Sequence, residues 1–129
     1  MINLLWVAAG GALGAVLRYL VSIQIAAETA TRFPWGTLTV NMLGCLVIGV
    51  MWSVTEHKTV SDGVLLFLMV GLIGSFTTFS TYGLEGIQLI QSGKLMAGFA
   101  YVLVSNIAGL LLVIIGKSMV DRFFIAAGG

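Results

Sequence analysis

Four long apolar stretches constrain this 129-residue chain more than any other feature of its sequence. Their uncharged cores are residues 1–17, 33–55, 63–84 and 95–116. A helix needs roughly 20 residues to cross ~30 Å of hydrocarbon, and each core is about that long. Hydrophobic residues make up 59% of the chain and charged residues only 9%, which is too few to cover a soluble globule. The sequence therefore predicts an all-α membrane protein with four transmembrane helices.

Short polar joints at residues 28–32, 56–62 and 91–94 separate the four stretches. None of them is long enough to hold a second domain, so we expect residues 1–129 to form a single transmembrane domain. His57 lies in the second joint, which reads as a loop, and the single Cys45 excludes an internal disulfide. We interpret both residues as structural.

Several function classes are disfavoured by what the apolar stretches lack. The six Lys and Arg residues are spread along the chain, so there is no basic patch for nucleic acid. No row of buried carboxylates suits a proton relay, and no cluster suits hydrolysis, so we do not expect an enzyme. The polar groups inside the stretches are neutral hydroxyls and amides beside aromatic rings, whose edges carry partial positive charge. Such a lining suits a small anion.

The positive charges are balanced between the two sides of the predicted topology. Lys58, Lys117 and Arg122 fall on one side, and Arg18, Arg32 and Lys94 on the other. Membrane orientation is set by an excess of Lys and Arg on the cytoplasmic side, and three against three gives no such excess. The balance favours dual topology with copies paired antiparallel; the alternative is a weak bias resolved by one loop.

Small residues recur at four-residue spacing in the first two stretches. Gly10 and Gly14 form one such pair, and Cys45 and Gly49 form another. This spacing lets helix backbones approach closely in lipid. Because four closely packed helices enclose little space, a transport path would lie between chains, which points to an oligomer.

The third stretch contains the most informative segment, residues 71–82, with the sequence GLIGSFTTFSTY. Hydroxyl and glycine residues here replace the unbroken apolar helix that hydrocarbon demands, so the pattern predicts a break near Gly74 to Thr78. Carbonyls freed by such a break are ligands for hard cations. If the helix resumes at about Thr78, Phe79 and Tyr82 stack on one face, with Glu85 one turn further. Alternatively, the hydroxyls bond to the preceding turn and the rings fill the core.

Two amides and one arginine lie deep in the other stretches. Asn41 follows Thr37 by one helical turn, so both lie on one face of the second helix. An amide at this depth needs a partner and serves either as interhelical glue or as a ligand site, and Asn106 faces the same choice. Arg18, late in the first stretch, could extend its side chain to the interface.

Three motifs together give the chain a family resemblance. They are GGALGAVLRY at residues 10–19, GTLTVN at 36–41, and GSFTTFSTY at 74–82 followed by Glu85. In this order and spacing the sequence resembles the Fluc (CrcB) family of fluoride channels over essentially its whole length. The resemblance implies an antiparallel dual-topology homodimer in the bacterial inner membrane, with two fluoride pores, that lets fluoride leave the cytoplasm passively.

The resemblance also implies roles for individual residues. Phe79 matches a phenylalanine whose ring edge faces fluoride, and Asn41 matches a pore amide. Ser80 and Thr81 match a row of polar residues that runs beside the aromatic rings in the family, and Thr37 is assigned to the same fluoride pathway. The backbone carbonyls of Gly74 and Thr77 match the ligands of a structural sodium ion on the dimer axis. Arg18 and Glu85 match structural positions.

Tyr82 departs from the family pattern, because most relatives have a second phenylalanine there. We expect its hydroxyl to point to a hydrated vestibule near Glu85, leaving only the ring edge for the ion. Two other classes remain open. A small dual-topology multidrug exporter would need a glutamate inside the first helix, which is absent before Glu28. A noncatalytic membrane assembly protein would use the hydroxyls only for packing.

Overall fold

The computed structural model describes residues 1–29 and 33–128 and is helical almost throughout. In chain order its elements are α1 (Ile2–Thr29), α2 (Trp35–His57), α3 (Asp62–Leu65), η1 (Leu66–Ile73), α4 (Gly74–Phe76), α5 (Phe79–Gln91) and α6 (Leu95–Gly128). Four segments are long and apolar enough to cross a membrane: α1, α2, the third segment from α3 through α5, and α6. The prediction of four such helices is confirmed. Of the first predicted joint, residues 30–32 with Arg32 lie outside the described residues.

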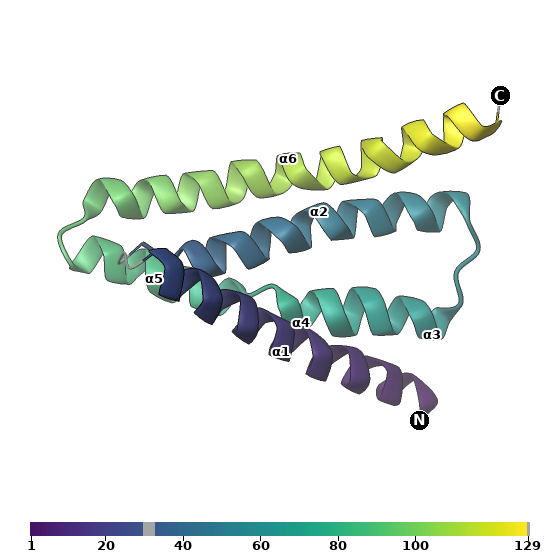
Figure 1. The fold of residues 1–129 in the computed structure, drawn as a ribbon, viewed down its shortest axis with the longest axis horizontal. Coiled ribbons are helices and arrows are strands. Elements are labelled where there is room, and N and C mark those ends of the chain that lie inside the picture. Colours follow the sequence, from purple (N-terminus) through teal and green to yellow (C-terminus); the bar gives the residue numbers. More distant parts are fainter. Residues whose placement is uncertain (30–32, 129) are drawn as a thin grey trace.

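The chain ends and the α2–α3 connection lie together at one end of the molecule (Figure 1). The turn between α5 and α6 lies at the opposite end, as four successive crossings require. Helix α6 runs beside α2, and α1 crosses η1 and α4. The α5–α6 turn uses Gly93 at φ 81°, and the amide of Lys94 donates to the Leu89 carbonyl at 3.0 Å. A glycine in this left-handed conformation is a common way to end a helix.

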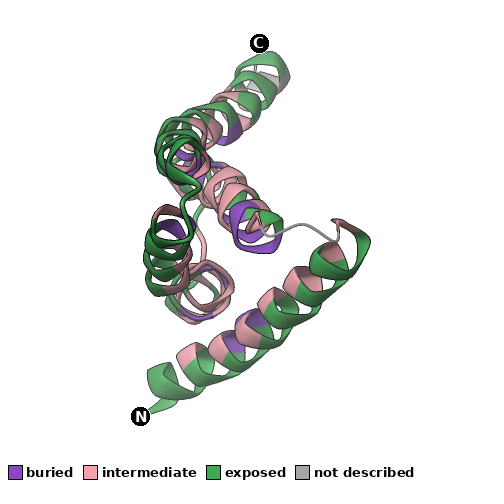
Figure 2. Cartoon of the chain, turned by 90° about the vertical axis from the view of Figure 1, so that its left-hand side faces the viewer, coloured by how far each residue is buried: buried purple, intermediate pink, exposed green. Residues whose placement is uncertain are grey.

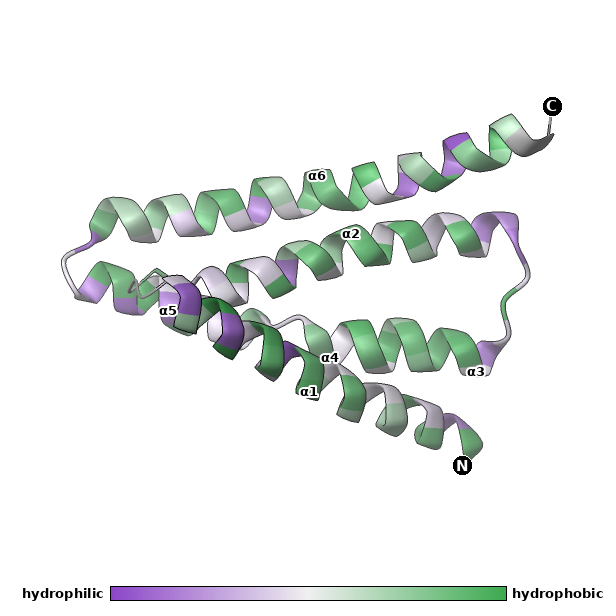
Figure 3. Ribbon diagram, viewed as in Figure 1, coloured by the Kyte–Doolittle hydropathy of each residue, from purple (hydrophilic) through white to green (hydrophobic). Residues whose placement is uncertain are grey.

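Most large apolar side chains face outward, as in a protein whose solvent is lipid. The buried cluster is small and consists of Leu38, Leu89 and Tyr101. Exposed residues cover the outer surfaces of the helices (Figure 2), and these surfaces are largely apolar (Figure 3). In water such a surface would be strongly unfavourable, whereas lipid tails are as apolar as the side chains themselves.

Close helix contacts occur where the small residues predicted them. A side chain added at Gly10 would overlap the Phe67 carbonyl oxygen of η1, and one added at Gly14 would overlap the Leu72 carbonyl oxygen. Gly49 meets the α6 backbone at Val113 in the same way. These positions let main chains touch, so dispersion contacts can hold the helices together without a hydrophobic driving force.

Two expectations about local structure need correction. Helix α2 continues through His57 and α3 begins at Asp62, so only residues 58–61 of the second joint form a loop. The third segment also departs from a regular α-helix over η1, a π-helix of 8 residues. After α4, Thr77 (φ −82°, ψ 159°) and Thr78 (φ −148°, ψ 121°) are extended, and α5 begins at Phe79.

Candidate functional site

The extended residues between α4 and α5 obtain hydrogen bonds from α2. The Asn41 side chain donates from Nδ2 to the Thr78 carbonyl at 3.0 Å and accepts from the Thr78 amide at 2.8 Å. One amide side chain therefore satisfies both backbone groups of a residue that has left the helix, which is the requirement for irregular backbone at membrane depth. In the structure Asn41 acts as interhelical glue, one of its two predicted roles.

Arg18 reaches the same connection from α1. Its Nε donates to the Ser75 carbonyl at 3.1 Å, and the side chain is half-buried. This contact, rather than extension to the membrane interface, is the one that the structure shows. Thr77 donates from both its amide and its hydroxyl to the Ile73 carbonyl, each at 3.1 Å. Part of the hydroxyl-rich motif thus bonds to the preceding turn, as the packing alternative predicted.

Some carbonyls at the connection have no hydrogen-bond donor shown among the described residues. Hydrogen bonds at this point reach the carbonyl oxygens of Ile73, Ser75 and Thr78. None is shown to the carbonyl oxygens of Gly74, Phe76 or Thr77. The family resemblance assigns two of these three, Gly74 and Thr77, to sodium.

The hydroxyl of Thr78 caps the N-terminus of α5 and contacts the polar residues that follow. It accepts from the Thr81 amide at 3.3 Å and donates to the Thr81 hydroxyl at 3.0 Å, while the Ser80 hydroxyl lies 3.5 Å away. This is an N-cap contact, which occupies an amide that has no partner in the first helical turn. Ser80 is exposed and Thr81 half-buried, so the structure brings both predicted residues to the start of α5.

Three aromatic rings form a column along α5 and α6. The ring centroids of Phe79 and Tyr82 are 5.4 Å apart, and those of Tyr82 and Tyr101 are also 5.4 Å apart. The predicted contact between Phe79 and Tyr82 is therefore present. Phe79 is 82% exposed, although it is a large apolar residue, and its ring partner Tyr82 is half-buried. The Phe79 ring edge is accessible to an ion or to another chain.

The Glu85 carboxylate is held by two hydroxyls from different helices. Thr37 of α2 donates to Oε1 at 2.9 Å, and Tyr101 of α6 donates to Oε2 at 3.0 Å. Because Thr37 and Asn41 share one face of α2, this helix contacts α5 at Glu85 and the α4–α5 connection one turn away. A charge inside a membrane protein is expensive unless it is paired or hydrogen-bonded, and here it is hydrogen-bonded twice.

The Tyr82 hydroxyl has a partner that the sequence did not predict. Asn106 of α6 donates from Nδ2 to the Tyr82 oxygen at 2.8 Å. The expectation of a hydrated vestibule near Glu85 did not include this partner, because helical spacing identifies neighbours within α5 but not on the helix packed opposite. Asn106 is thus an interhelical partner of Tyr82.

A groove of about 430 Å³ brings part of these residues together, whereas Thr37, Ser80, Thr81 and Glu85 are not among the residues that line it. Its wall contains the connection, the aromatic pair and facing residues of α2 and α6. The lining residues are Asn41, Met42, Gly44, Cys45, Ile48, Met69, Ile73, Gly74, Thr77, Thr78, Phe79, Tyr82, Ser105 and Asn106. The Ser105 hydroxyl is buried here and has no hydrogen-bond partner among the described residues. A buried hydroxyl without a partner is costly unless something fills the groove.

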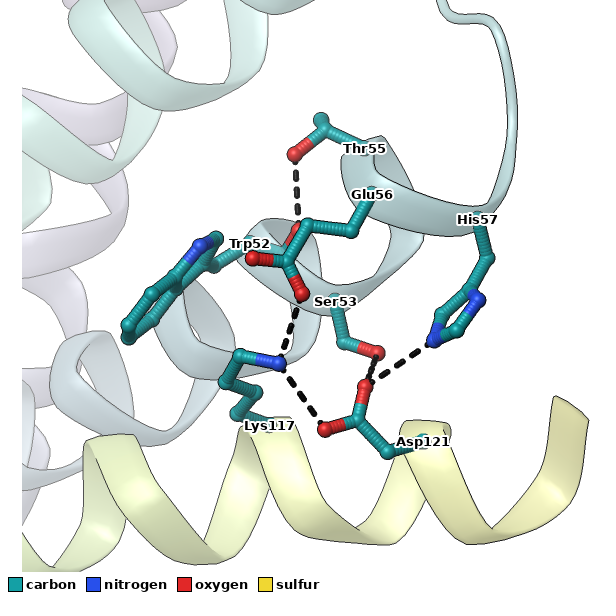
Figure 4. Close-up of polar contacts among 7 residues, drawn as sticks. All are labelled: Trp52, Ser53, Thr55, Glu56, His57, Lys117 and Asp121. Carbon is teal, nitrogen blue, oxygen red and sulfur yellow. Dashed lines mark hydrogen bonds and ion pairs between the residues drawn. The ribbon is translucent and has the colours of Figure 1, made fainter. Parts of the chain in front are cut away.

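A second polar cluster joins α2 to α6 at the end that carries the chain termini (Figure 4). Lys117 donates to Glu56 at 2.6 Å and to Asp121 at 2.9 Å. Ser53 and His57 contact the other oxygen of the Asp121 carboxylate. Lys117 and Asp121 are four residues apart on one face of α6. The contacts between α2 and α6 join partners that are 61 to 68 residues apart, so spacing alone could not pair them.

Comparison with known proteins places the whole arrangement in one family. The model of the family described as CrcB-like protein, Camphor Resistance (CrcB), matches residues 5–117. The chain belongs to the CrcB family. The relatives of this CrcB chain include proteins named fluoride-specific ion channel FluC. That of Salinibacter ruber is 47% identical, covering 90% of this chain and 87% of the relative. That of Phocaeicola vulgatus is 44% identical, covering 90% of this chain and 96% of the relative. That of Chloroflexus aurantiacus is 43% identical, covering 96% of this chain and 98% of the relative.

Within this CrcB chain, sequence reasoning overlooked Tyr101 and Ser105. Ser105 follows Tyr101 by four residues on α6, so the two share one face of this helix. A Tyr and a Ser at this spacing in an otherwise apolar span are a signal that could have found them.

Proposed function

We propose that this chain is a fluoride-specific ion channel and not an enzyme. The observation that carries the proposal is the groove, in which neutral hydroxyl and amide groups lie beside an exposed aromatic edge. Fluoride is strongly hydrated, so conduction needs several weak donors that replace water without trapping the ion. The relatives named fluoride-specific ion channels support the same ion.

We place the ion path along Asn41, Phe79, Tyr82, Ser80, Thr81 and Thr37. The extended residues Thr77 and Thr78 constitute the break in the third span, and Arg18 and Asn41 hold it. Among the described residues no lysine or arginine lines the groove, so none of them places a fixed positive charge that would trap the anion. Passive flow through this path lowers cytoplasmic fluoride, with the bacterial inner membrane as the expected location.

The working unit is an antiparallel homodimer. Three observations support it: the outward position of Phe79, the open groove beside it, and the three-to-three balance of positive charges. A second copy would cover the groove and bring an aromatic pair of its own to the ion path. Two copies related by an axis in the membrane plane make such a contact symmetric.

The residues at the break fit a structural sodium ion. Among the described residues, no hydrogen-bond donor is shown for the Gly74 and Thr77 carbonyls, nor for that of Phe76 between them. Carbonyl oxygens are suitable ligands for a hard cation, and two copies would supply two each. The ion would neutralise the carbonyl dipoles where the paired breaks meet.

Fluoride efflux from liposomes tests the proposal. Purified protein is reconstituted into vesicles loaded with potassium fluoride, and a fluoride electrode records release after valinomycin is added. We expect rapid release of fluoride and none of chloride from matched vesicles. Phe79→Ile, which keeps an apolar side chain but removes the ring edge, is expected to abolish release while the protein stays folded. Release no faster than from protein-free vesicles loaded with the same potassium fluoride would refute the proposal.

A further inference from the structure

The Tyr82 hydroxyl is held in a defined hydrogen-bonding role by Asn106. The Asn106 Nδ2 atom lies 2.8 Å from the Val102 carbonyl oxygen as well as 2.8 Å from the Tyr82 oxygen. A carbonyl oxygen can only accept, so the atom facing it is the amide nitrogen rather than the amide oxygen. The same nitrogen therefore donates to Tyr82, and the tyrosine oxygen accepts.

An accepting hydroxyl still has its own hydrogen to donate. Tyrosine carries one O–H donor, and among the described residues no acceptor for it is shown. Glu85, the nearest carboxylate along α5, is engaged by Thr37 and Tyr101 instead. The Tyr82 ring is in contact with Phe79 and Tyr101, which limits its movement. Tyr82 and Asn106 both line the groove, so a donor without a partner is fixed at its wall.

We propose that Tyr82 and Asn106 form an anion-binding position for fluoride, in which the Tyr82 hydroxyl donates to the ion and Asn106 is its positioning residue. The proposal rests on the proposed channel function. Tyr82 lies one helical turn from Phe79, so an ion could pass from the Phe79 ring edge to the Tyr82 hydroxyl. A hydroxyl polarised by an amide donor is a stronger donor than an isolated one. This chain would therefore hold fluoride more tightly than a channel with an aromatic edge alone, and release it more slowly.

A double-mutant cycle of Tyr82→Phe and Asn106→Leu tests the pair by fluoride flux. Hydrogen bonds to ions are strong enough that Tyr82→Phe is expected to raise the half-saturating fluoride concentration roughly ten-fold or more, and to increase the maximal rate. Asn106→Leu should likewise raise both the half-saturating fluoride concentration and the maximal rate. The double variant should match Tyr82→Phe alone, because the amide works only through the hydroxyl. An unchanged Tyr82→Phe channel, or fully additive effects, would overturn the proposal.

A spectroscopic arm separates this inference from the channel function. Donation to fluoride shifts the near-ultraviolet absorption of a tyrosine, so sodium fluoride added to the detergent-solubilised protein should give a difference spectrum with sodium chloride as reference. The signal should vanish in Tyr82→Phe and weaken in Asn106→Leu. Tyr19→Phe, the same change at a residue that is 65% exposed on α1, should retain it. A wild-type signal without flux would reject the channel function but keep the site; flux with a signal that persists in Tyr82→Phe would reject the site.

Discussion

Replacement of Asn41 by leucine is the sharpest test of how the α4–α5 connection is held. The Asn41 side chain serves both the amide and the carbonyl of Thr78, and leucine is similar in size but can do neither. Each backbone group left without a partner costs about 1–3 kcal/mol, so loss of both costs roughly 2–6 kcal/mol. The connection borders the groove, where water can replace part of the loss, so we expect the lower half of that range.

Reversible unfolding in mixed micelles, followed by circular dichroism, measures this free energy. Asn3→Leu is the matched control, since it makes the same substitution at an exposed residue of α1 and should change stability by less than about 0.5 kcal/mol. Fluoride flux through Asn41→Leu should fall as well, because Phe79 follows Thr78 directly. An Asn41→Leu protein as stable as the wild type would show that the connection does not depend on this amide.

Four further predictions concern the Glu85 and Asp121 contacts, the proposed dual topology and the proposed sodium site. Tyr101→Phe and Thr37→Val each remove one donor to the Glu85 carboxylate and should lower the unfolding free energy by roughly 1.5–3 kcal/mol, whereas the same Tyr→Phe change at exposed Tyr19 should not. Asp121→Asn removes the charge that Lys117 faces and should lower the thermal midpoint in a salt-sensitive manner while leaving fluoride flux unchanged; a large loss of flux would place the α2–α6 cluster on the ion path. Added lysines in the α2–α3 connection should suppress activity of a single gene until an oppositely biased copy is supplied, and full activity from one biased copy would argue against dual topology. Exchange of sodium for a large organic cation should lower the stability of the reconstituted dimer, and an unchanged midpoint would argue against the sodium site.

The sequence predicted what depends on neighbours along one helix. Four apolar stretches gave the four helices, because length and composition alone decide whether a segment suits hydrocarbon. Spacing within a helix also placed Phe79 against Tyr82 and put Thr37 and Asn41 on one face. These relations follow from the 3.6-residue period, which is a property of the backbone.

Spacing along the sequence did not predict the contacts between helices. Arg18 meets a carbonyl 57 residues away, and His57, which we expected in a loop, meets Asp121 64 residues away. The Tyr82 hydroxyl was expected in a vestibule near Glu85, three residues further on, and it accepts a hydrogen bond from Asn106 of α6. Periodicity shows which residues share a face, but the partner of that face depends on packing details such as the close approach of glycines. One sequence does not encode these details in any readable pattern.

The reversal potential of the current in a planar bilayer is the most direct test of a passive fluoride channel. With a tenfold fluoride gradient and equal pH on both sides, the current should reverse at about 59 mV, the equilibrium potential of a monovalent ion at 25 °C. A superimposed proton gradient should leave that value unchanged, because no proton is coupled to the ion. A reversal potential that moves with the proton gradient would indicate proton-coupled exchange, and one near zero would show that fluoride is not the selected ion.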